Sequence, residues 1–203
     1  MTIRKGEDWG RAAQLPHDGV VVRTDAEARH VVTEARREGR PIPVLGLLGG
    51  DLARSVGATG DEARLRSDLA QEVPVDLGSV LIDGTSHWFV AHLVARRRLW
   101  AGRFVVAMNA EYLGSWKVAP RGHPNDGRLD LFDGQLSFND RLKARQRLPY
   151  GGHVPHPAIK NRQEESLEVQ FERPTPIFLD GEAVGRARHL SIRLEPDAIC
   201  CVF

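Results

Sequence analysis

The sequence predicts a protein of the α/β plus all-β class, in which a small βαβ unit packs on a β-sandwich or barrel-like domain. Three observations lead to this prediction. Two short apolar runs near the N-terminus flank one amphipathic helical segment. From about Pro74 onward, many short apolar runs are separated by glycine, proline and aspartate, a texture typical of β-sheet domains. The chain of 203 residues, 41% of them apolar, is long enough to bury one sizeable core.

The N-terminal part is predicted to begin with an irregular arm over residues 1–18, which show no clear period. A short strand follows at VVVR (20–23). Thr24 and Glu27 then form a capping box, which starts a helix that Gly39 ends. This helix supplies the crossover of the βαβ unit.

The second strand of that unit is predicted at IPVLGLL (42–48), a near-continuous apolar run typical of a strand covered on both faces. Gly49 and Gly50 turn the chain, and Asp51 is expected to cap a short helix, LARSV, before Gly57. The N-terminal part is therefore one βαβ unit with a second helix attached.

The remaining elements are mostly strands. VDLGSVLID (75–83) and HWFVAHL (87–93), joined by a turn at Asp83-Gly84, predict a hairpin. One later helix is predicted from Asn139 to Arg147. Cys200 and Cys201 fall in the terminal apolar run and predict a buried strand, not a disulfide framework or a zinc site. The other predicted strands are FVVAM (104–108), LDLF (129–132), SLEVQF (166–171), TPIFL (175–179), HLSIRL (189–194) and AICCVF (198–203).

The charge balance excludes some classes of function. With 28 basic and 27 acidic residues the net charge is +1, so no overall field gathers nucleic acid. No run is long and apolar enough to span a bilayer, and MTIRKGEDWG lacks the apolar core of a signal peptide. We therefore expect a cytoplasmic protein that does not bind nucleic acid.

Acidic residues beside glycines recur on turns in the last third of the chain. NDGRLDLFD (125–133), GGH (151–153) and FLDGE (178–182) follow one another between short apolar runs. Oxygen atoms on such turns suit a hard cation such as Mg²⁺. Taken alone, either Asp-Gly turn is better explained as an ordinary β-turn.

The order of these motifs resembles the bacterial diacylglycerol-kinase-like lipid kinases, relatives of sphingosine kinases and, more distantly, of NAD kinases. The similarity covers roughly residues 20–203. Besides DGRLD, GGH and LDGE, the segments that carry it are GGDLARSVG (49–57), PVDLG (74–78), WFV (88–90), VVAMN (105–109) and VAP (118–120).

The resemblance implies a fold and a set of site residues. It divides the chain into a truncated α/β remnant of the nucleotide-binding lobe, residues 1–72, and a β-sandwich domain of the lipid-kinase/NAD-kinase type, residues 73–203. Asp126, the carbonyl of Arg128 and Asp130 would form the family's accessory magnesium site. Glu182 would orient the hydroxyl that attacks the γ-phosphate of ATP, and Asp180 would shape the turn or assist the metal.

The nucleotide side departs from the family pattern. Where the family has a GGDGT loop, this chain has RTDAE (23–27), in which only Asp25 remains and marks the start of a helix. The second family loop is shortened to LGGD (48–51), whose Gly49, Gly50 and Asp51 keep a helix N-terminus that can hold one phosphate or carboxylate. Only 19 residues precede Val20, so we expect that much of the usual lobe has no counterpart in this sequence.

Two functions follow as hypotheses. The first is a lipid-kinase-like phosphotransferase, or its diverged descendant, that binds a phosphorylated or lipid-like ligand in the interlobe cleft, with Mg²⁺ and possible use of ATP. The alternative is a catalytically inactive pseudokinase that binds a ligand or a protein. A two-stranded remnant cannot bury both faces, so we expect a close lobe interface or a homodimer. ARRRLWAGR (95–103) suits either a solvated face or peripheral contact with an acidic membrane.

Overall fold

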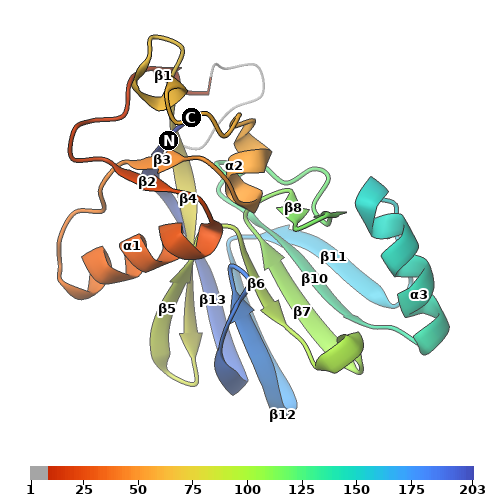
Figure 1. Ribbon diagram of the computed structural model, residues 1–203. Coiled ribbons are helices and arrows are strands. Elements are labelled where there is room, and N and C mark those ends of the chain that lie inside the picture. Colours follow the sequence, from red (N-terminus) through yellow and green to blue (C-terminus); the bar gives the residue numbers. More distant parts are fainter. Residues whose placement is uncertain (1–8) are drawn as a thin grey trace.

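The computed structural model describes residues 9–203, which form one strongly curled sheet with helices on its outside (Figure 1). The described helices are α1 (Asp25–Arg37), α2 (Asp51–Val56) and α3 (Phe138–Arg147), with short 3-10 turns η1 (Arg64–Arg66), η2 (Arg98–Trp100) and η3 (Leu148–Tyr150). The strands are β1 (Arg11–Ala12), β2 (Val20–Val22), β3 (Leu45–Leu47), β4 (Gln71–Ile82), β5 (Thr85–Phe89), β6 (His92–Ala95), β7 (Arg103–Met108), β8 (Tyr112–Leu113), β9 (Trp116–Lys117), β10 (Leu129–Gln135), β11 (Ile159–Glu164), β12 (Ser166–Leu179) and β13 (Glu182–Val202).

The sheet follows the order β1-β4-β13-β12-β6-β7-β10-β11 among the described residues. β5 is added to β4, and β2 and β3 are added through β3, which pairs in parallel with the end of β13. β8 and β9 form a separate small hairpin. The predicted class is confirmed: a small βαβ unit joins a β-sandwich-like sheet.

The βαβ unit forms as its sequence predicts. β2 and β3 pair in parallel, with Val20 opposite Leu45. Thr24 is the N-cap of α1, and its hydroxyl accepts a hydrogen bond from the Glu27 N–H at 3.1 Å. The Glu27 carboxylate in turn accepts from the Arg23 N–H at 2.7 Å, and Gly39 follows the helix with φ of 64°. The predicted cap and stop are both confirmed.

The predicted hairpin also forms, but its second run divides into two strands. Ile82 pairs with Thr85 across the Asp83-Gly84 turn. HWFVAHL then ends β5 at Phe89 and starts β6 at His92, and β6 pairs with β7 and β12 instead of β4. The break has a physical reason, because the N–H groups of residues 90–92 donate to a buried aspartate, Asp180.

Two pairs of predicted strands are each one long strand. SLEVQF and TPIFL are both parts of β12, and HLSIRL and AICCVF are both parts of β13. The pairing register shifts between Gln170 and Thr175 and between Glu195 and Ile199. Pro174 and Pro196 lie in these two intervals, and proline has no N–H to donate to a ladder. The prolines therefore interrupt the pairing without ending the strand.

The cores lie on the two sides of this sheet. The curled interior is filled by side chains such as Phe89, Leu93, Leu129 and Leu190. A second core joins the βαβ unit to the ends of β4 and β13, with α1 on its outside. Cys201 is fully buried there, and both cysteines are free, which agrees with the strand prediction.

The junction between the two predicted parts of the chain lies within the sheet. β4 starts at Gln71 and runs across the predicted boundary after residue 72. Glu72 of β4 pairs with Arg11 of β1 and with Val202 of β13. Of the predicted irregular arm, residues 1–8 lie outside the described residues, and β1 gives the rest one short strand. The domain boundary and the homodimer stay predictions. Within residues 9–203, no helix has the length and apolar character required to cross a bilayer.

Candidate functional site

Asp25, which the resemblance matches to the family's first nucleotide loop, caps helix α2 instead of facing solvent. Both of its oxygens are occupied, because the Asp51 N–H donates to Oδ2 at 2.6 Å and the Leu52 N–H donates to Oδ1 at 3.0 Å. The side chain is almost fully buried, and this burial raises the pKa of the carboxyl. The predicted cap, Asp51, is instead the first helical residue, and Gly50 is the N-cap. The helix is therefore capped from a distant turn.

The two glycines of LGGD allow this close approach. Gly50 has φ of 102°, and a Cβ there would lie 2.6 Å from Asp25 Oδ1. A Cβ on Gly49 would lie 2.5 Å from the Arg23 carbonyl oxygen. Glycine is thus required at both positions by packing of the β3-α2 turn on the β2-α1 turn. Their predicted role in holding a phosphate stays a prediction.

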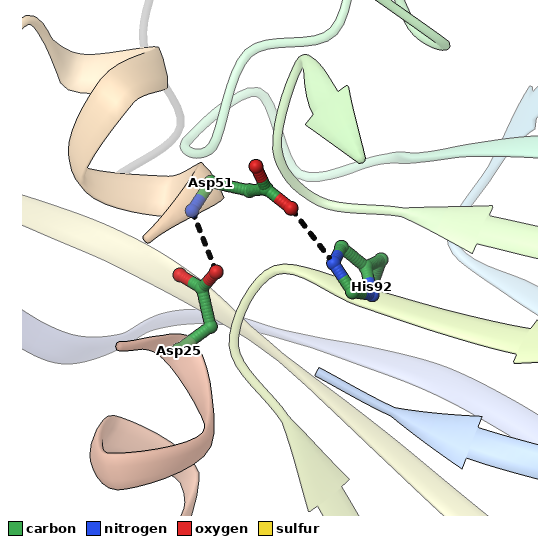
Figure 2. A group of neighbouring side chains, drawn as sticks. All are labelled: Asp25, Asp51 and His92. Atoms are coloured by element: carbon green, nitrogen blue, oxygen red, sulfur yellow. Dashed lines mark hydrogen bonds and ion pairs between the residues drawn. The ribbon is translucent and has the colours of Figure 1, made fainter. Parts of the chain in front are cut away.

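Asp51 forms a buried pair with His92, a residue that the motif comparison did not select. His92 Nε2 lies 3.1 Å from Asp51 Oδ2 (Figure 2). The same Asp51 oxygen also accepts a hydrogen bond from the Gly114 N–H at 2.8 Å. Burial alone would lower the pKa of His92, but the Asp51 hydrogen bond and the charge of Asp180 raise it. Burial likewise favours a higher pKa for Asp51, yet the hydrogen bonds from His92 and Gly114 lower it. The two shifts both favour the charged forms, an imidazolium beside a carboxylate.

Asp180 of the LDGE turn is a structural anchor for the start of β6. It accepts hydrogen bonds from the N–H groups of Val90, Ala91 and His92 at 2.8–3.0 Å. Its side chain has no exposed surface, and burial raises its pKa to about 6. The contacts seen here hold residues 90–92, and both predicted roles of Asp180, shaping its own turn or assisting a metal, stay predictions.

Glu182, the predicted acceptor-orienting residue, lies at the start of β13 and is half exposed. Its carboxylate forms an ion pair with Arg29 and lies 3.0 Å from His30 Nε2, so both partners come from α1. Arg29 Nε also lies 3.9 Å from Asp180 Oδ2. Arg29 thus links the helix of the βαβ unit to both acidic residues of the LDGE turn.

A polar cleft of about 570 Å³ opens beside these groups. Asp25, Asp51, His92 and Asp180 line it, and Glu182 is not among its lining residues. Its other walls are formed by Thr24, Gly50, Val94, Arg96, Trp100, Leu113, Gly114, Ser115, Trp116, Phe178 and Gly181. The structure therefore brings together Asp25, Asp51 and two members of the LDGE turn, Asp180 and Gly181.

Asp25, Asp51 and His92 also offer ligand atoms that lie within 4.8 Å of one another. Among the described residues they are the only such group of three or more acidic, histidine or cysteine side chains. Carboxylates suit Mg²⁺, whereas imidazole suits transition metals, so the set is mixed for the expected Mg²⁺. The N–H groups that already bond Asp25 also compete with a cation there.

An apolar pocket of about 360 Å³ adjoins the polar cleft. It lies between α3, η2 and the strands β7 and β10, and Phe104, Val106 and Phe132 form its floor. The two volumes share one wall, made of Arg96, Trp100, Leu113 and Trp116. The two spaces therefore lie side by side, one lined by charged side chains and the other mainly by apolar ones.

The DGRLD turn lies outside both spaces. Asp126 accepts a hydrogen bond from the Arg128 N–H at 3.0 Å, and Asp130 is buried on β10. Burial, together with the charge of Asp126, raises the pKa of Asp130 to about 6. Two neighbouring carboxylates that are poorly solvated fit a cation, so the predicted magnesium site at Asp126, Arg128 and Asp130 stays open.

Buried Asp76, also missed by the motif comparison, holds this turn. Its carboxylate accepts from the Gly127 N–H at 2.8 Å and from the Asp197 N–H at 2.9 Å. Asp76 in PVDLG and His92 in HWFVAHL share one signal in the sequence, a polar residue inside an otherwise apolar strand. A buried polar side chain requires partners, so each marks a specific interaction.

The fold defines a β-sandwich-like protein with a small α/β part, and a comparison with protein families gives its family. The model of the YegS C-terminal NAD kinase beta sandwich-like domain matches residues 69–203, so the chain belongs to this family. The expected relation to the diacylglycerol-kinase-like lipid kinases is thereby confirmed at the level of family and fold. No curated protein matches the chain.

Solved structures extend the likeness to the α/β part. A candidate diacylglycerol kinase from Bacillus anthracis strain Sterne superposes with a TM-score of 0.69 at 16% identity, over 91% of this chain and 76% of that chain. A diacylglycerol kinase from the same strain gives a TM-score of 0.60 at 16% identity, over 91% and 75%. At this identity the likeness concerns the fold.

Proposed function

We propose that this protein is a diverged member of the diacylglycerol-kinase-like family that binds a neutral, hydroxyl-bearing lipid. The polar end of the lipid would lie in the polar cleft and its chain in the apolar pocket. The observation that carries the proposal is the wall shared by the two spaces, Arg96, Trp100, Leu113 and Trp116. Both volumes fall in the range of about 300–1,000 Å³ of small-molecule sites.

The polar end of the ligand is inferred from the charges in the cleft. Asp25, Asp51 and Asp180 place three carboxyl groups there, against His92 and Arg96. Carboxylates accept hydrogen bonds from alcohol groups and repel phosphate. Arg96 does not offset them at the acidic end, because its guanidinium stacks over the rings of Trp100 and Phe178. A neutral alcohol is therefore favoured over its phosphorylated form.

The nucleotide side supports binding without ATP turnover. In phosphate-binding loops, the N–H groups at a helix start donate to the phosphate. Here the Asp51 and Leu52 N–H groups donate to Asp25. Thr24 is likewise engaged, as the cap of α1. This arrangement favours the pseudokinase alternative on the ATP side while it leaves the lipid side open.

One observation favours a second candidate, a phosphotransferase. The Asp51 and His92 pair faces the cleft, where a carboxylate can accept the proton of a ligand hydroxyl. Glu182 would then have an indirect role, since Arg29 and His30 engage it. A Mg²⁺ ion held at Asp25 and Asp51 would supply charge neutralisation for a bound phosphate.

Calorimetric titrations with dioctanoylglycerol, dioctanoyl phosphatidic acid and ATP, with and without Mg²⁺, test both candidates. We expect dioctanoylglycerol to bind and phosphatidic acid to bind at least about tenfold more weakly. We expect no binding of ATP at millimolar concentration. Ala144→Phe, which fills the apolar pocket from α3, should abolish lipid binding, whereas Gln146→Phe on the same helix, outside the pocket lining, should not.

The outcomes separate the candidates. If dioctanoylglycerol fails to bind the wild-type protein, or if Ala144→Phe binds it as well as Gln146→Phe does, the lipid proposal is wrong. If ATP binds and its γ-phosphate is transferred to dioctanoylglycerol, the phosphotransferase is correct. In that case Asp51→Asn should remove transfer without removing lipid binding.

A further inference from the structure

The mouth of the apolar pocket carries an unusual group of exposed apolar side chains. Leu99 on η2 is 71% exposed, and Phe138 and Leu142 on α3 are 65% and 50% exposed. They are three of the six exposed large hydrophobic side chains among residues 9–203, and all three line this one pocket. Exposed apolar groups gathered at one opening indicate an interaction surface rather than chance exposure.

The backbone holds Leu99 in this exposed position at some conformational cost. Leu99 and Trp100 are consecutive non-glycine residues in the left-handed region, with φ of 55° and 57°. Arg141 of α3 fixes the turn, because its Nη1 donates to the Leu99 carbonyl oxygen at 2.8 Å. Strain of this kind is characteristic of functional positions. Residues 96–100, which contain η2, and α3 therefore form one structural unit, which we call the pocket rim.

The charge on the pocket rim differs from that of the chain as a whole. Residues 96–100 and 138–147 contain seven basic side chains and one acidic side chain, whereas the chain has 28 basic and 27 acidic residues. Within the described residues, Arg97, Arg98, Arg145 and Arg147 have no acidic side chain in ion-pair distance. The single acid, Asp140, accepts from Ser137 and lies 3.9 Å from Lys143. The rim is thus strongly cationic.

We infer that the pocket rim docks on an anionic lipid bilayer, with Leu99, Phe138 and Leu142 inserted into the interface and the surrounding basic side chains against the headgroups. Exposed apolar side chains ringed by unpaired basic ones are the composition of interfacial membrane-binding segments. A protein partner fits less well, because the buried cores of protein interfaces are depleted in charged residues as a whole. α3 lies at the opposite end of the sheet from α1, which leaves the rim accessible (Figure 1).

Vesicle flotation tests this inference. The full chain is mixed with vesicles of phosphatidylcholine alone or with about 30% phosphatidylglycerol, which carry the same acyl chains and differ in charge. We expect binding to the anionic vesicles only, and a clear loss when NaCl is raised from about 0.05 M to about 0.5 M. The vesicles contain no neutral alcohol lipid, so the result does not depend on the proposed ligand.

Matched variants test whether the pocket rim is the surface that binds the vesicles. Leu99→Ser with Leu142→Ser should weaken binding at least about tenfold through lost apolar insertion, while Leu69→Ser with Leu81→Ser removes exposed leucines elsewhere and should leave it unchanged. Arg98→Glu and Arg145→Glu should each weaken vesicle binding about fivefold or more. Arg173→Glu and Arg193→Glu, which lie elsewhere on the surface, should weaken it less. All of these positions are exposed, so an unchanged thermal midpoint verifies folding.

Three outcomes would overturn the inference. The first is equal binding to neutral and anionic vesicles. The second is an equal loss of binding in the rim and control variants. The third is sedimentation equilibrium showing that the Leu99 and Leu142 substitutions dissociate a dimer while vesicle binding is unaffected, which would make the rim an interface between copies of the chain.

Discussion

Replacement of Asp25 by alanine is expected to lower the free energy of unfolding by about 3 kcal/mol. The change removes two hydrogen bonds from backbone N–H groups to a carboxylate, at 2.6 and 3.0 Å. Hydrogen bonds to charged groups contribute about 1.5–3 kcal/mol each. Burial of the Asp25 carboxyl group is unfavourable for its charged form and raises its pKa. Alanine removes this cost of burial, which offsets part of the lost hydrogen-bond energy. The Leu52 N–H is buried and would lose its only side-chain partner.

The magnitude is checked by urea unfolding, followed through tryptophan fluorescence and circular dichroism. For a chain of this length, a loss of about 3 kcal/mol lowers the thermal midpoint by roughly 6–12 °C. Asp25→Asn keeps one acceptor oxygen and should show about half the loss. Thr24→Ala, on the same turn, removes only an exposed cap of α1 and should cost about 1 kcal/mol.

The comparison between these variants decides the role of Asp25. If Asp25→Ala is no more destabilising than Thr24→Ala, its carboxylate does not hold the start of α2. The α2 N–H groups would then be free for a ligand, and the argument against a phosphate at this position would fail.

Two further predictions concern the other acidic groups. Asp180→Ala leaves three backbone N–H groups without their acceptor and should lower the free energy of unfolding by about 3 kcal/mol or more. Glu182→Gln, at a half-exposed ion pair, should lower it by less than about 1 kcal/mol. Equal shifts in the urea midpoint of the two variants would contradict the anchoring role of Asp180. The Asp51 and His92 pair should make stability depend on pH. Because the folded-state pKa of His92 is raised, its contribution is complete below its ordinary pKa of about 6.5 and is lost as the pH rises through the raised value. Because that of Asp51 is lowered, its contribution is complete above about 3.9 and is lost as the pH falls through the lowered value. As the pH rises above about 6.5, wild-type stability should therefore fall more steeply than that of His92→Asn, and parallel curves would show that the pair does not contribute.

The local signals in the sequence were reliable where short-range chemistry decides the outcome. Thr24 and Glu27 start α1, Asp83-Gly84 turns the β4-β5 hairpin, and the apolar run around Cys201 is a buried strand. Each depends on groups a few residues apart, so the pattern of residue types is sufficient. The ordered motifs likewise identified the family, since their order is preserved even where single turns are ordinary.

The sequence by itself therefore determined the class of fold, most of the strands and the family. Only the tertiary structure decided what the site is made of. Asp25 and Leu52 are 27 residues apart, His92 and Asp51 are 41 apart, and Asp180 and Val90 are 90 apart. Contacts at such separations depend on how the sheet curls and on which strands lie side by side. A local pattern of residue types in the sequence does not predict either of these. The same packing made Asp25 the cap of a distant helix and placed a polar cleft beside an apolar pocket.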